Sequence, residues 1–158
     1  MYVWYDLYTR CINLFKHQIS AKMIKKKLPF PKDIKPMPAT LITEPFDNPG
    51  WLSQIKCDGY RAIAYLQKGE VDIRSRNNKS FNEKFYPVLQ AMQSWKINAV
   101  VDREIVVINE EGSSDFGGLQ NWRSGADGHL VFYAFDILWM EGDLMNCTLF
   151  ERRNILKK

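Results

Sequence analysis

The amino-acid sequence predicts an α+β protein, with largely antiparallel β-sheets and helices packed against them. Three observations point this way. Long runs rich in β-branched and aromatic residues recur after residue 50, short turns rather than helical crossovers join the first of them, and one intervening segment changes to helical periodicity. With 158 residues, 46% of them hydrophobic, the chain is long enough for one domain with a core and short for two.

The first 35 residues differ from the rest in charge and proline content. Residues 2–19 space their apolar side chains as an amphipathic helix does, and residues 28–38 carry four prolines, which favours an extended linker. The chain has a net charge of +4, and the positive excess is concentrated in "KMIKKK" at 22–27. Such a run is typical of a solvated stretch, and it would also attract nucleic acid. We therefore expect an N-terminal helix and basic, proline-rich linker over 1–35, followed by a domain over 36–158.

The domain is expected to open with three strands joined by two tight turns. Asp58 and Gly59 form the first predicted turn, and Gly59 would supply a positive φ or a close backbone approach. "KGE" at 68–70 then reverses the chain into the next strand. The predicted strands are 51–56, 60–66 and 71–76.

The remainder alternates between helical and strand patterns. Residues 81–95 place their large apolar side chains on one helical face, whereas residues 99–108 and 129–138 are long strand-like runs. Residues 110–125 between those runs read as a turn-rich loop, and residues 150–158 look like the opening of another helix.

Several classes of protein are disfavoured by composition. The three cysteines are widely spaced without a CxxC pair, and the two histidines are isolated, so neither a disulfide framework nor a zinc site is predicted. No apolar run approaches the length of a membrane span, and the N-terminus does not resemble a signal peptide. We expect a protein of the reducing cytoplasm without a membrane partner.

Lys56 stands on the first predicted turn, between apolar runs that suggest partial burial. A lysine nucleophile reacts only when it is unprotonated, and both burial and a nearby cation favour that form. Arg61 on the returning strand could supply this cation and also bind a phosphate or a ribose. The same hexapeptide, "KCDGYR", is also compatible with an ordinary hairpin that carries a surface lysine.

This hexapeptide resembles the nucleophile motif of the covalent nucleotidyltransferases, which comprise ATP-dependent DNA ligases, RNA ligases and mRNA capping enzymes. Three further stretches follow in the order of that family's motifs. They are "SRNNKSFNEKF" at 75–85, "VVDREIVV" at 100–107 and "FYAFDIL" at 132–138. The flanking segments "KPMPATL", "DFGGLQNWR" and "FERRNIL" narrow the resemblance to the ligase domain of bacterial DNA ligase D, a non-homologous end-joining enzyme.

The resemblance implies a nucleotidyltransferase (ATP-grasp-like) fold, incomplete at the C-terminus, and a DNA ligase reaction in DNA repair and recombination. Lys56 would attack the α-phosphate of ATP, expel pyrophosphate and form lysyl-AMP. The AMP would pass to the 5′-phosphate of a nick, and the adjoining 3′-hydroxyl would displace it. A divalent cation, Mg²⁺ or Mn²⁺, is implied, although the sequence does not identify its ligands.

The resemblance also assigns binding roles to five residues. Glu104 would hydrogen-bond the ribose hydroxyls, Phe135 would stack on adenine, and Gln54 would meet the adenine amino group. Arg61 would bind the phosphate or ribose of the nucleotide, and Arg76 would contact phosphates of AMP or DNA. Each side chain also has a simpler interpretation, as an exposed polar residue or, for Phe135, as a core aromatic.

Other features favour a different interpretation. A glycine of the family's D-G-E motif is replaced by Arg103, a bulky cation expected beside Glu104, and the family's later motifs and OB-fold domain are not found after Phe150. The chain could therefore be a catalytically incompetent fragment that binds nucleotide or DNA. Expected partners are nicked or broken duplex DNA, end-joining proteins and a separate C-terminal fragment. The reactive residues do not distinguish DNA from RNA as acceptor.

Overall fold

The computed structural model describes residues 29–46 and 48–157. The helix predicted for residues 2–19 and the basic run at 22–27 therefore lie outside the described residues. No helix in the described part is long and apolar enough to cross a bilayer.

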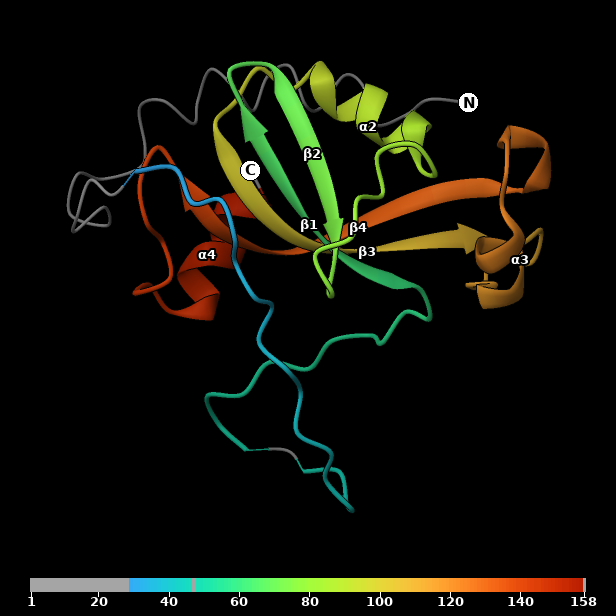
Figure 1. Cartoon of the computed structure of the whole chain (residues 1–158). Coiled ribbons are helices and arrows are strands. Elements are labelled where there is room, and N and C mark those ends of the chain that lie inside the picture. Colours follow the sequence, from blue (N-terminus) through green and yellow to red (C-terminus); the bar gives the residue numbers. More distant parts are fainter. Residues whose placement is uncertain (1–28, 47, 158) are drawn as a thin grey trace.

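Four antiparallel strands form a single sheet in the order β2-β1-β3-β4 (Figure 1). The strands are β1 (Tyr60–Gln67), β2 (Glu70–Ser75), β3 (Ala99–Ile108) and β4 (His129–Met140). The prediction of an α+β protein with antiparallel pairing is confirmed, and the predicted bounds of β3 agree with those observed. Because β1 lies between β2 and β3, both of its hydrogen-bonding edges are occupied.

The turn between β1 and β2 is the hairpin that the sequence predicts. Lys68 and Gly69 connect the strands with φ values of 53° and 85°. Two successive positive φ values match the twist of the strands they join, and glycine reaches such values without steric cost. This hairpin fixes the register in which Ile63 faces Arg74 across the two strands.

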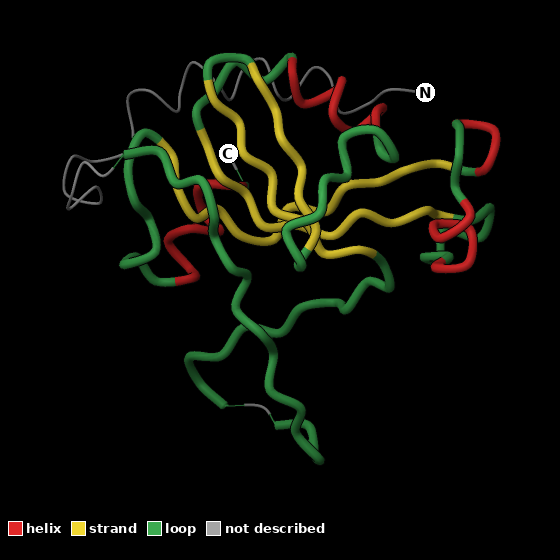
Figure 2. Tube along the Cα trace, viewed as in Figure 1, coloured by secondary structure: helices red, strands yellow, loops and turns green. Residues whose placement is uncertain are grey.

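Short helices pack around the sheet, as the red segments of Figure 2 show. They are α2 (Tyr86–Gln93), α3 (Phe116–Asn121), a 3₁₀ turn (Gly125–Asp127) and α4 (Leu149–Leu156). The helix predicted over 81–95 is thus shorter than its apolar pattern, and the predicted loop at 110–125 contains α3. The α3 helix begins where the side chain of Asp115 accepts a hydrogen bond from the Gly118 amide, a local cap that periodicity does not reveal.

The sheet has two chemically different faces. One face carries the main hydrophobic core, in which side chains from β1 and β3 pack against α2, α3 and α4. The other face carries a smaller cluster of Ile63, Tyr65, Val100 and Trp139, together with charged side chains further along the strands. Successive side chains of a strand alternate between these faces, so each face receives every second residue.

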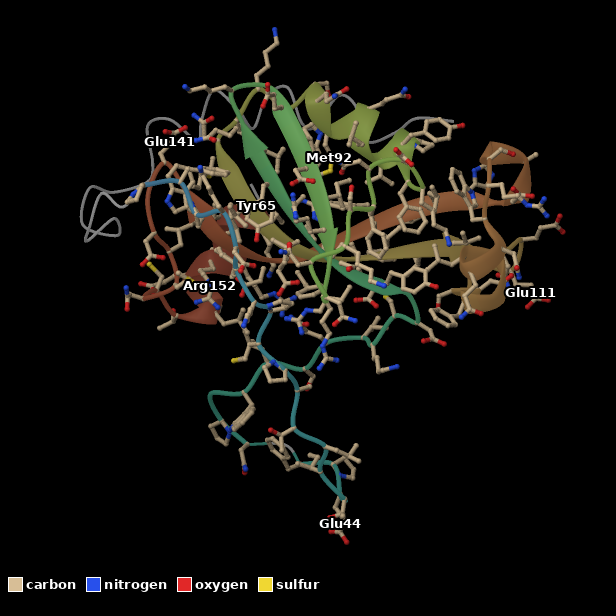
Figure 3. The ribbon with its side chains drawn as sticks, viewed as in Figure 1. Glu44, Tyr65, Met92, Glu111, Glu141 and Arg152 are labelled. Carbon is tan, nitrogen blue, oxygen red and sulfur yellow. The ribbon has the colours of Figure 1, made fainter. Side chains whose placement is uncertain are left out.

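Residues 29–38 cover the second face instead of standing apart as a linker. They are extended, as their prolines predict, but Phe30 packs edge-to-face on Trp139 with ring centroids 5.0 Å apart. The backbone amide of Ile34 donates a hydrogen bond of 2.7 Å to the hydroxyl of Tyr65, which Figure 3 labels near the blue ribbon of this segment. The segment therefore packs as part of the folded unit.

The described residues of the 39–58 segment form a long loop that hangs below the sheet in Figure 1. Glu44 lies at its outer end in Figure 3. The strand predicted for 51–56 is wrong, because these residues pair with no strand of the sheet. Their apolar side chains resemble a strand pattern but remain exposed; Ile55, for example, is 93% exposed.

Candidate active site

Arg61 and Asp102 form an ion pair on the second face of the sheet. The Nε and Nη2 atoms of Arg61 donate to the two carboxylate oxygens of Asp102 at 3.1 and 2.6 Å. The Nη1 atom donates to the backbone carbonyl of Met37 at 2.7 Å. A planar guanidinium held on two sides has a fixed orientation. Sequence reasoning missed Asp102, although its two-residue spacing from Glu104 places both carboxylates on one face.

Glu104 lies directly across from Arg61 in the pairing of β1 with β3. Partial burial raises the pKa of Glu104 above its ordinary value, and the positive charges of Arg61 and Lys56 offset part of that rise. Asp102 acts in the opposite direction, because a second carboxylate disfavours the charged form. The structure therefore brings the predicted Glu104 and Arg61 together, with the Lys56 ammonium near enough to act on Glu104 electrostatically.

Phe135 joins this group through an irregularity in β4. The register of β3 with β4 shifts between Asp102 and Arg103, which face Asp136 and Ala134. Phe135 is thus the extra residue of a β-bulge, a feature that redirects a side chain. The guanidinium carbon of Arg61 lies 5.5 Å from the centroid of the half-buried Phe135 ring, within range of a cation–π interaction.

Lys56 lies on the 39–58 loop, and its side chain is exposed. The expectation of partial burial is wrong, because the apolar neighbours on this loop point to solvent as well. Lys56 makes no hydrogen bond or ion pair with another described residue. Three residues later, the backbone at Gly59 lies close against β3: a β-carbon on Gly59 would lie 2.3 Å from the carbonyl oxygen of Ile105. The predicted close backbone approach at Gly59 is confirmed, although no hairpin forms there.

Gln54 and Arg76 are both exposed, in different parts of the molecule. Gln54 lies on the same loop as Lys56 and has no hydrogen bond to a described residue. Arg76 follows the end of β2, where it lines a groove between the β2–α2 turn and the 33–38 segment. The structure thus groups Arg61, Glu104 and Phe135 closely, and it leaves Gln54 and Arg76 at the periphery.

Arg103 does not lie beside Glu104, contrary to the expectation from sequence. Alternation along β3 turns its side chain to the main core, where it is fully buried. Its guanidinium carbon stacks 3.4 Å from the ring centroid of Phe132, and Nη1 lies 2.9 Å from the sulfur of Met92. The substitution of glycine by arginine therefore leaves the face that carries Glu104 unobstructed.

A second ion pair supports the neighbourhood of Phe135. The side chain of Arg152 on α4 donates from Nε and Nη2 to the two oxygens of Asp136, at 2.7 and 2.8 Å, and from Nη1 to the carbonyl of Cys147. Both side chains of the pair are mostly buried. Asp136 therefore anchors α4 to the strand that presents Phe135.

Residues 34–158 match the family model of the ATP-dependent DNA ligase domain. The chain belongs to this family. The match includes the ligase-domain residues described above, from Met37 to Arg152. The resemblance stated from the motifs, and the fold class that it implied, are confirmed.

Relatives and solved structures agree with the assignment to the ligase domain. The multifunctional non-homologous end joining protein LigD of Pseudomonas aeruginosa is 33% identical over 135 residues, which are 80% of this chain and 15% of that protein. LigD of Mycolicibacterium smegmatis is 32% identical over 146 residues, 90% of this chain and 19% of that protein. The solved ligase domain of Mycobacterium tuberculosis LigD aligns with a TM-score of 0.57 and 32% identity, covering 65% of this chain and 33% of that one.

A mycobacterial DNA ligase D complexed with ATP and MES aligns with a TM-score of 0.58 and 29% identity. That alignment covers 65% of this chain and 34% of the solved chain. The present ligase-domain chain thus spans about a third of the solved structures and less than a fifth of the two LigD proteins.

Among the described residues of this ligase domain, no group of three or more His, Cys, Asp or Glu side chains is arranged to hold a metal ion. One carboxylate at the site already has a partner, because Asp102 forms an ion pair with Arg61. The described residues therefore do not form a cage for a divalent cation.

Proposed function

We propose that this chain is the nucleophile-bearing part of an ATP-dependent DNA ligase that joins strand breaks in repair and end joining. The observation that carries the proposal is the position of Lys56 on a loop fixed to β3, with its charge acting on Glu104. Glu104 in turn faces Arg61, and Arg61 contacts Phe135. A ribose-binding acid, a cation and an aromatic ring would thus lie together on one face of the sheet, with the nucleophile on the loop that leads into β1.

The reaction begins when Nζ of Lys56, having released a proton to solvent, attacks the α-phosphorus of ATP. A phosphorus–nitrogen bond forms as the bond to the bridging oxygen of the β-phosphate breaks, and pyrophosphate leaves. The adenylate then moves to the 5′-phosphate at a nick in duplex DNA, which restores the lysine. Attack by the 3′-hydroxyl on that activated phosphate seals the strand and releases AMP.

The remaining residues would bind and orient the nucleotide. Glu104 accepts hydrogen bonds from the ribose hydroxyls, and Phe135 stacks on adenine by the ring face that Arg61 leaves open. Arg61, held by Asp102, points a fixed donor fork towards the ribose or phosphate. Gln54 reaches the adenine amino group from the Lys56 loop.

Arg76 would contact a phosphate of AMP or of DNA. A divalent cation would enter the site bound to the phosphates of ATP. We place the domain in the bacterial cytoplasm, where thiols such as those of Cys57 and Cys147 would stay reduced. End-joining proteins are the proposed partners.

Incubation with ATP labelled on its α-phosphate, in the presence of Mg²⁺, tests the proposal. We expect one covalently bound adenylate per chain, and peptide mapping should locate it on Lys56. Lys56→Arg keeps the positive charge and should abolish the label, because the guanidinium remains protonated. The matched control Lys96→Arg alters an exposed lysine elsewhere and should label normally. A label that persists in Lys56→Arg would refute the assignment of the nucleophile.

A second function is favoured by the exposure of Lys56. In this alternative the chain is a catalytically incompetent ligase fragment that binds nucleotide or DNA without reacting. Transfer of labelled AMP from the chain to a nicked duplex would exclude it. The same assay with nicked RNA decides between DNA and RNA as acceptor.

A further inference from the structure

Two ion pairs lie next to each other on β3 and β4. Asp102 of β3 is paired with Arg61, and Asp136 of β4 is paired with Arg152 of α4. The backbone pairing of the two strands places Asp102 directly opposite Asp136. Directly opposed residues project from the same face of a sheet, with β-carbons about 4.5–5.5 Å apart. Two carboxylates are therefore neighbours, and each has an arginine of its own.

The two carboxylates also compete for positive charge. Like charges directly opposite each other destabilise a pair of strands, so each carboxylate needs a cation. Hydrogen bonds to Asp102 contribute most to the raised pKa of Arg61, partial burial opposes the rise, and the charge of Asp136 adds to it. Asp136 is thus close enough to attract the guanidinium that the proposed nucleotide site uses.

Arg152 occupies both carboxylate oxygens of Asp136. Its Nε and Nη2 atoms donate to them at 2.7 and 2.8 Å, and Nη1 donates to the carbonyl of Cys147 at 2.6 Å. Figure 3 labels Arg152 on α4. The two side chains are only 15% and 13% exposed, so water screens their attraction weakly. With Asp136 neutralised from α4, the Arg61 guanidinium stays on Asp102.

We propose that Arg152 is a positioning residue for nucleotide binding, because it keeps the Asp136 carboxylate from drawing Arg61 away from Asp102. The proposal rests on the proposed ligase function, in which Arg61 directs its donors towards the ribose or phosphate of ATP. Without the charge of Arg152, Asp136 would be a mostly buried carboxylate that lacks its cation. Arg61 would then divide its hydrogen bonds between two acids, and its donor fork would lose its fixed orientation.

A purely mechanical role is the competing explanation for the same ion pair. Arg152 joins α4 to β4, so its removal would loosen the helix as well as release Asp136. The two explanations differ when Asp136 is neutralised in addition, because the helix remains detached while the competing charge is gone. Asp136→Asn keeps the side-chain oxygen that accepts the hydrogen bond of the Ile137 amide, so this local contact is preserved.

NMR of the ¹⁵N-labelled 158-residue chain without nucleotide observes the Nε–H group of Arg61, and the variant Arg61→Lys assigns its signal. We expect Arg152→Met to shift this signal, and Asp136→Asn/Arg152→Met to return it towards the wild-type position. The matched control Arg153→Met removes a positive charge from the next position of α4, where the arginine has no ion pair with a described residue. It should leave the signal unchanged.

Adenylation with α-labelled ATP gives the second measurement. The apparent KM for ATP should rise roughly fivefold to tenfold in Arg152→Met, the scale of coupling within one charge network, with a smaller change in the maximal rate. It should return to within about twofold of wild type in the double variant, and it should stay there in Asp136→Asn alone. The melting temperature should fall in both Arg152 variants, because neither retains the contact between α4 and β4.

An unshifted Arg61 signal in Arg152→Met would overturn the proposal, as would a KM that is raised equally in the single and the double variant. A KM raised in Asp136→Asn alone would also overturn it, which keeps the test decisive if Arg152→Met does not fold. The NMR measurement needs no ATP. An absence of adenylation in the wild-type chain would therefore refute the ligase function, and the Arg61 signal would still decide whether Arg152 controls Arg61.

Discussion

Replacing Gly59 by alanine perturbs the contact that holds the Lys56 loop against β3. The added β-carbon would lie 2.3 Å from the carbonyl oxygen of Ile105 and 2.6 Å from a methyl carbon of Val106. Non-bonded heavy atoms settle at about 3.5 Å, so the loop must move away from β3 by roughly 1 Å. The Ile105 carbonyl belongs to the backbone of a paired strand and cannot turn aside as a flexible side chain would.

Two quantities should change in Gly59→Ala, by different amounts. The free energy of unfolding should fall by about 1–3 kcal/mol, the usual cost of inserting a methyl group into a packed site. The rate of Lys56 adenylation should also fall, by up to about 100-fold, since a misplacement of roughly 1 Å at a reacting group can cost that much. Urea unfolding followed by circular dichroism measures the first quantity, and labelling with α-labelled ATP measures the second.

Gly125→Ala is the matched control, because a β-carbon there meets no atom within 4 Å. It should change the free energy of unfolding by less than about 0.5 kcal/mol and leave adenylation unaltered. Normal stability together with a normal labelling rate in Gly59→Ala would show that the loop is not held by this contact.

Two substitutions at the site, Asp102→Asn and Glu104→Gln, and a comparison at Asp72 test how the charges contribute to stability. Asp102→Asn should lower the free energy of unfolding by about 1.5–3 kcal/mol, because it weakens a charged hydrogen-bond pair whose acid is buried. In urea unfolding, Asp72→Asn should cost less than about 1 kcal/mol, since its pair with Arg74 is more than a third exposed on both sides; equal losses would contradict this ranking. Glu104→Gln should raise the melting temperature at pH 7–8, because the folded state raises the pKa of Glu104 and so disfavours its ionised form. The gain in melting temperature should vanish as the pH falls towards about 4, where the carboxyl is protonated in the unfolded chain as well. A gain that grows as the pH falls would contradict a raised pKa of Glu104 in the folded state.

The sequence correctly predicts two kinds of strand. One kind pairs with the next strand along the chain, and the other contains a long apolar run. The hairpin at Lys68 and Gly69 needs only local turn chemistry, and the run at 99–108 is apolar enough to be a buried central strand. The run at 51–56 has a similar apolar pattern, but β1, the strand that follows it, already pairs on both edges. Pairing is a property of the whole sheet, which a local pattern does not contain.

The site shows the same division between local and non-local information. Arg61, Glu104 and Phe135 are candidates from motif order, and the strand register explains why the first two lie opposite each other. Asp102 could have been found by applying the two-residue period of a strand, which also places Arg103 on the opposite face. The bulge that presents Phe135 depends on how β4 fits β3, and nothing in the run "FYAFDIL" marks it.

The packing of the 29–38 segment has a practical consequence for any shortened version of the protein. A cut at residue 36, where composition alone places the start of the domain, would strip Phe30 and Ile34 from Tyr65 and Trp139. The rings of Tyr65 and Trp139 would then be more exposed to solvent. The groove beside them would also lose part of the wall that the 33–38 segment forms. Such a shortened protein is expected to self-associate and to bind a hydrophobic dye. The proline-rich stretch should therefore be kept in any shortened version, because it covers apolar surface of the sheet.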